Sequence, residues 1–168
     1  MHWMYYIQGC YLINMEMKGS FVVDFSVDKV WGVVSNANMF SKCLPNVAST
    51  SVDGDNFQMQ FKVDAKKYTA KFLGASYLSN LNIKFSAELK EKQENKHILI
   101  QGDGSTIGLK FSLALYIDLD AQDSSTKIDW KAEIELGKMA KLFGENVINQ
   151  AVMDVVNQTI ENLKALLK

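Results

Sequence analysis

The chain has 168 residues, and hydrophobic residues occupy 48% of its positions, which is sufficient for one folded domain with a substantial core. Its formal net charge is −1, so no overall field attracts nucleic acid or an anionic membrane. All 18 basic residues are lysines, and the chain therefore lacks the forked guanidinium that usually recognises phosphate or guanine. These properties argue against extended disorder and against a nucleic-acid partner.

The segment at 1–14 is rich in aromatic residues but has no basic start, and its apolar stretch is too short to cross a bilayer. We interpret it as a leader outside the domain, either disordered or the product of a start codon assigned too early, and we place a single domain at 15–168. The alternative is an interfacial anchor that uses its aromatic side chains, Trp3, Tyr5, Tyr6 and Tyr11.

The domain begins with a strand at 20–25, where apolar residues occupy alternate positions. A short helix is predicted at 26–36, with Ser26 as its N-cap, because serine at this place accepts a hydrogen bond from the first turn. A second short helix follows directly and runs up to Pro45, which cannot continue it.

Six further stretches alternate apolar and polar residues with a period of two, as strands do when one face is buried and the other is wet. They lie at 56–63, 68–72, 81–89, 97–101, 109–119 and 126–136. Turn residues separate them at 53–56, 93–95, 102–105 and 122–125. With the first strand, this pattern predicts about seven strands in an antiparallel meander.

The last stretch, 137–168, predicts a long amphipathic helix. Its apolar face has a period of 3.6 residues and consists of Ile148, Val152, Val155, Val156, Ile160, Leu163, Leu166 and Leu167. The element order predicts an α+β domain in which this helix covers the concave face of a curved sheet. Glu145, Asn149 and Thr159 project to the same side as this apolar face, so they need partners, water or a ligand.

Four large aromatic residues face the predicted concave side from separate strands: Phe61, Phe85, Phe111 and Trp130. Two interpretations stay open, because aromatic side chains on a buried sheet face either fill a core or line a pocket. If they line a pocket, Asn149 and Thr159 are the polar groups that orient a ligand inside it.

Few residues suit catalysis or metal binding. The two cysteines, Cys10 and Cys43, have no metal spacing, which favours a reducing compartment, the cytoplasm. His2 and His97 are the only histidines, and His97 beside a lysine at a strand start is typical of a surface residue. We therefore predict no catalytic set, no metal and no cofactor.

Two segments resemble the carbon monoxide dehydrogenase CoxG family, which belongs to the START-like, helix-grip superfamily. The first, at 25–47, is similar to the family's tryptophan-bearing helix and its proline-glycine-valine turn. The second, at 135–156, is similar to the glycine- and lysine-containing run before the long helix. The matching residues are Trp31, Pro45, Val47, Gly137, Lys138, Met139, Ala140 and Gly144. Asn46 and Leu136 replace family glycines, and the stretch at about 64–80 is longer than usual.

The resemblance implies a cavity between sheet and helix that holds a hydrophobic small molecule, such as a quinone or a lipid. It also implies service to a molybdenum hydroxylase and transient contact with the inner face of the membrane. The residues that we expect to line this site are Phe40, Leu44, Phe61, Phe85, Phe111, Trp130, Ile148, Asn149, Val152 and Val156. Access would require the segment at 38–46 to move against the long helix.

Two other functions remain open. One is an enzyme of the cyclase or hydrolase type from the same superfamily, for which Glu145 is the candidate acid or base. The other is a structural adaptor whose cavity is filled by side chains; no void would then separate Phe111, Trp130 and Val152.

Overall fold

The computed structural model describes residues 4–7, 10–64 and 80–168, with side chains from Met15 onward. Eight strands form one antiparallel sheet in the order β1-β2-β8-β7-β6-β5-β4-β3. The strands are β1 (Met4–Ile7), β2 (Cys10–Val23), β3 (Val47–Asp53), β4 (Asn56–Val63), β5 (Leu81–Gln93), β6 (His97–Thr106), β7 (Leu109–Gln122) and β8 (Ser125–Glu135). The predicted meander is confirmed from β3 to β8, and β2 adds to it beside the last strand.

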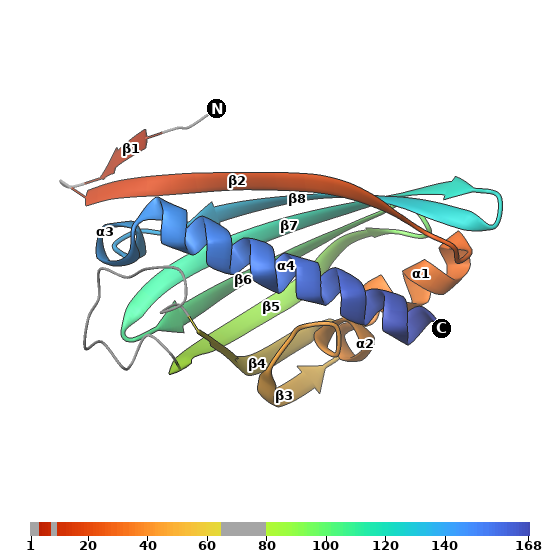
Figure 1. Ribbon diagram of the computed structural model, residues 1–168, viewed down its shortest axis with the longest axis horizontal. Helices are drawn as coiled ribbons and strands as arrows, with labels where there is room; N and C mark the ends of the chain where they lie inside the picture. Colours follow the sequence, from red (N-terminus) through yellow and green to blue (C-terminus); the bar gives the residue numbers. More distant parts are fainter. Residues whose placement is uncertain (1–3, 8–9, 65–79) are drawn as a thin grey trace.

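Four helices complete the domain: α1 (Val27–Val34), α2 (Ala37–Ser41), α3 (Met139–Phe143) and α4 (Glu145–Leu167). Figure 1 shows α4 lying across one face of the curved sheet, with α3 at its N-terminal end and α1 and α2 near its C-terminal end. This arrangement confirms the predicted α+β, helix-grip fold with a long helix over the sheet. Gly144 separates α3 from α4 with a φ of 84°, which glycine adopts without steric cost.

Alternation of apolar residues located most strands because one face of the sheet is buried. In β4, for example, Phe57, Met59 and Phe61 are buried, whereas their neighbours are exposed or half-buried. The sequence missed β3, because six of its seven residues are exposed and no apolar alternation marks an edge strand of this kind. The predicted strand at 68–72 lies outside the described residues.

One predicted turn is wrong. The stretch at 102–105, which contains two glycines, lies inside β6 and not in the hairpin that follows it. The turn is formed instead by Ile107 and Gly108, whose φ angles are 45° and 79°. The glycines therefore serve a purpose within the sheet, which the cavity below explains. The family turn glycine is replaced by Asn46, which adopts the left-handed conformation expected of it, with a φ of 55°.

The predicted leader overlaps two strands. Residues 4–7 form β1, which pairs with β2, and β2 itself begins at Cys10. Asn14 pairs with Glu135 of β8, so the end of this segment continues the sheet. Its role as a leader or as an interfacial anchor stays a prediction.

Candidate functional site: an apolar cavity beneath the long helix

A cavity of about 270 Å³ lies between the sheet and α4. Strands β2 and β4 to β8 line it together with residues of all four helices. Phe111, Trp130 and Val152 are among the lining residues, so a void lies between them. The structure thus speaks against the adaptor interpretation, which required these three side chains to pack without a void.

The cavity exists because the buried core is divided. One cluster packs at the C-terminal end of α4 and the other packs at its N-terminal end. Within α4 itself, the buried residues are Ile148 near the start and Leu163 and Leu167 near the end. The middle of the apolar face, including Val155 and Thr159, is only half-buried. The helix is therefore fixed at both ends and leaves space beneath its centre.

Two glycines on the concave face allow aromatic rings to lie against the sheet. A Cβ atom on Gly19 would lie 2.8 Å from Nε1 of Trp130, its partner across the β2–β8 pairing. A Cβ atom on Gly104 would overlap the ring of Phe111, its partner across the β6–β7 pairing. Because neither glycine has a side chain, the rings rest on the strands and the space beneath α4 stays open.

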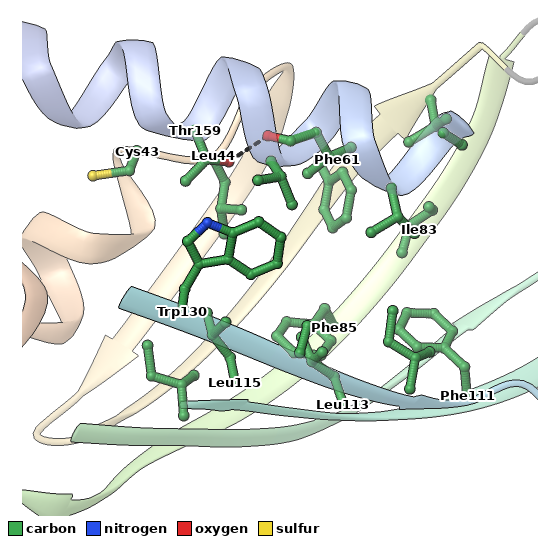
Figure 2. A pocket seen from close by; sticks show the side chains of 18 of the residues that line it. Cys43, Leu44, Phe61, Ile83, Phe85, Phe111, Leu113, Leu115, Trp130 and Thr159 are labelled. Carbon is green, nitrogen blue, oxygen red and sulfur yellow. Dashed lines mark hydrogen bonds between the residues drawn. The ribbon is translucent and has the colours of Figure 1, made fainter. Parts of the chain in front are cut away.

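Aromatic contacts continue across the sheet from this position. The rings of Phe85 and Phe111 are stacked, with centroids 6.2 Å apart and an interplanar angle of 5°. Phe57 meets Phe85 edge-on at 6.4 Å, and Phe40 of α2 meets Phe57 at 6.1 Å. Such pairs stabilise ring positions beyond their burial alone. The cavity wall formed by Phe85 and Phe111 is therefore held in place by packing (Figure 2).

Nine of the ten predicted site residues line the cavity, and Asn149 does not. Asn149 is exposed, so the prediction that it orients a ligand is wrong. Figure 1 shows α4 crossing β5 and β6 at an angle, so the lining positions shift around the helix from Val147, Ile148 and Ala151 to Val156 and Ile160. Averaging one apolar face over the whole helix placed Asn149 inside, although it lies on the outer side of its own turn. The role of the other nine in ligand binding stays a prediction.

Carboxylates and other charged groups lie away from the described cavity wall. Glu145 is exposed and does not line the cavity, so it is not placed to act there as an acid or base. His97 lies elsewhere in the sheet, with Nδ1 at 2.6 Å from Oδ1 of Asp118, as expected for a surface residue. Among the described residues, no group of three or more His, Cys, Asp or Glu side chains could hold a metal ion.

Cys43 is the lining residue with a titratable side chain. Burial raises the pKa of its thiol from the ordinary value of 9.0 to about 12, because the thiolate would lose its hydration. Its Sγ atom lies 3.7 Å from the backbone oxygen of Met39. At neutral pH the residue is thus a protonated, weakly polar part of an apolar wall.

A pH dependence of stability follows from this thiol. The pKa is higher in the folded than in the unfolded protein, so the stabilisation is complete below pH 9 and is lost as the pH rises to about 12. We expect the free energy of unfolding to fall by at most about 1.4 kcal/mol per pH unit in this range. Urea titrations of the wild type and of Cys43→Ala should differ in this slope. Equal slopes would contradict the burial of an un-ionised thiol.

Comparison with known proteins gives a consistent result. The family model for carbon monoxide dehydrogenase CoxG matches residues 19–168. No curated protein matches the chain in sequence. Among the described residues, no helix is long and apolar enough to cross a membrane.

Solved structures share the fold over most of both chains. A conserved protein from Geobacillus kaustophilus has a TM-score of 0.74 and 15% identity, covering 91% of this chain and 95% of that chain. A START superfamily protein from Mycobacterium smegmatis has a TM-score of 0.62 and 10% identity, with 90% and 96% covered. The Zhui aromatase/cyclase from Streptomyces sp. R1128 has a TM-score of 0.62 and 9% identity, with 92% and 93% covered. Identities this low show the fold alone, and they confirm the predicted fold class.

Proposed function

Because this chain belongs to the carbon monoxide dehydrogenase CoxG family, we propose that it is a binding protein that carries a quinone or lipid-like molecule beneath α4. The proposed recipient or donor of this molecule is a molybdenum hydroxylase such as carbon monoxide dehydrogenase. The observation that carries the proposal is the cavity, whose described wall is built almost entirely from aliphatic and aromatic side chains. A site of this composition suits an uncharged, hydrophobic ligand.

Burial of ligand surface supplies the binding free energy. Apolar surface contributes about 25 cal/mol per Å², so a ligand that buries on the order of 300 Å² gains roughly 7 kcal/mol before the cost of association. A carboxylate placed inside the same wall would lose its hydration without gaining a partner. We therefore expect neutral ligands to bind more tightly than ionised fatty acids.

The first test is mass spectrometry of an organic extract from protein purified without detergent. Chains beginning at Met1 and at Met15 should be compared, because the second lacks the predicted leader. A stoichiometric quinone or lipid in both would support the proposal, and recovery from the longer chain alone would indicate that its N-terminal segment contacts the membrane. An empty protein that also fails to respond in tryptophan fluorescence to added quinones would contradict the carrier function.

A hydrogen bond connects α4 to the segment at 38–46, where we expect a ligand to gain access. The side-chain nitrogen of Asn162 donates to the backbone oxygen of Cys43 at 2.8 Å. Phe40, Cys43 and Leu44 from the same region line the cavity. Opening at this place would break the bond to Asn162, so the bond would slow ligand release.

We expect Asn162→Leu to raise the ligand dissociation rate and to lower the free energy of unfolding by about 1–2 kcal/mol, because the oxygen of Cys43 loses its donor. Stopped-flow dilution of a bound fluorescent fatty alcohol would measure the rate. Asn149→Leu is a matched control, since it makes the same change at an exposed position of α4. Identical dissociation rates in the two variants would show that access lies elsewhere.

A further inference from the structure

Four of the lining residues carry a hydrogen bound to oxygen, nitrogen or sulfur in their side chains, and three of them direct it at the protein itself. Thr159 Oγ1 donates to the backbone oxygen of Val155 at 2.6 Å, and Thr106 Oγ1 donates to that of Asn82 at 3.0 Å. Cys43 Sγ lies 3.7 Å from the backbone oxygen of Met39. These donors are therefore occupied, including Thr159, which the sequence suggested as a polar contact for a ligand.

The fourth residue is Trp130, and its indole nitrogen has no acceptor among the described residues. Figure 2 shows the indole projecting from β8 into the space beneath α4, with the nitrogen on the side nearer the helix in this view. Gly19 makes this position possible, since a Cβ atom there would lie 2.8 Å from Nε1. A tryptophan N–H within a protein usually finds a partner, and an unpaired one costs free energy.

The geometry points to Trp130 as the hydrogen-bond donor that the cavity presents to its ligand. The ligand would then carry a neutral acceptor oxygen, such as the carbonyl of a quinone, ketone or ester, next to the indole and surrounded by hydrocarbon. This inference rests on the proposed carrier function and deepens it. Trp130 would choose among hydrophobic molecules of similar size, because those without an acceptor leave the N–H unpaired in an apolar wall.

A pair of small probes with the same carbon skeleton tests this role. Duroquinone carries two carbonyl oxygens and durene carries none, and full ring substitution prevents thiols from adding to the quinone. Affinities would be measured by displacement of the uncharged reporter N-phenylnaphthylamine. We expect Trp130→Phe to weaken duroquinone binding about three- to tenfold, as for loss of one neutral hydrogen bond, and to change durene binding less than about twofold.

Two control variants separate the hydrogen bond from cavity shape. Phe111→Leu alters the wall without removing a polar hydrogen, so it should weaken both probes alike. Trp31→Phe changes a tryptophan that does not line the cavity, and both affinities should remain. Equal weakening of the two probes by Trp130→Phe would overturn the inference and leave the carrier function standing. Failure of the wild type to bind either probe would overturn both.

A measurement on the wild type alone guards against a variant that does not fold. A hydrogen bond to a carbonyl weakens its double bond, so the infrared carbonyl band of bound duroquinone should lie at lower wavenumber than the band in hexane. The band should return toward the hexane value in folded Trp130→Phe. A band in the wild type that matches the hexane position would overturn the inference.

Discussion

Val155→Trp is expected to remove most ligand binding and leave the domain folded. Val155 lies on the half-buried middle of α4 and lines the cavity, so a larger side chain there points into the void. If the indole displaces on the order of 100 Å² of ligand contact, the loss is roughly 2.5 kcal/mol, or roughly 60-fold in affinity. The midpoint of thermal unfolding should stay the same or rise, because filling a void adds contacts. Displacement of N-phenylnaphthylamine and a thermal scan measure the two effects.

Asn157→Trp is the matched control, because it introduces the same side chain on the exposed side of the same helix. It should leave ligand affinity unchanged. Wild-type affinity in Val155→Trp would mean that the ligand binds outside the cavity. A large fall in its thermal midpoint would mean that the middle of α4 is packed more tightly than its half-buried side chains indicate.

Gly104→Ala should lower both stability and ligand affinity. The added methyl group would overlap the ring of Phe111, whose backbone is fixed by pairing within the sheet. The ring can escape only into the cavity, which breaks its stack on Phe85 and fills the ligand space. Overpacking of this kind costs about 1–3 kcal/mol, which lowers the thermal midpoint by roughly 2–4 °C per kcal/mol in a domain of this size.

Gly32→Ala provides the contrast. This glycine lies in α1, and a Cβ atom there would meet nothing within 4 Å. Alanine stabilises an exposed helix interior by roughly 0.5–1 kcal/mol relative to glycine, so the thermal midpoint should rise. If Gly104→Ala behaved like Gly32→Ala, the view that Gly104 holds the cavity open would be wrong.

The family motifs and the periodicities located most of the fold for local reasons. Alternation identified β4, β5, β7 and β8, because each buries one face and wets the other. The same rule failed for β3, which buries almost nothing. It also assigned the glycines at 102 and 104 to a turn, since glycine is common in turns and its use under an aromatic ring leaves no trace in nearby residues.

Side-chain periodicity and family resemblance were sufficient for the α+β class, the helix over the sheet and nine of the ten residues that line the cavity. The angle at which α4 crosses the strands was needed to see that Asn149 faces outward, because a helical wheel assumes one direction along the whole helix. Strand pairing was needed to bring Gly19 under Trp130 and Gly104 under Phe111. Such contacts join residues far apart in the chain, and both the open cavity and the position of the indole inside it depend on them.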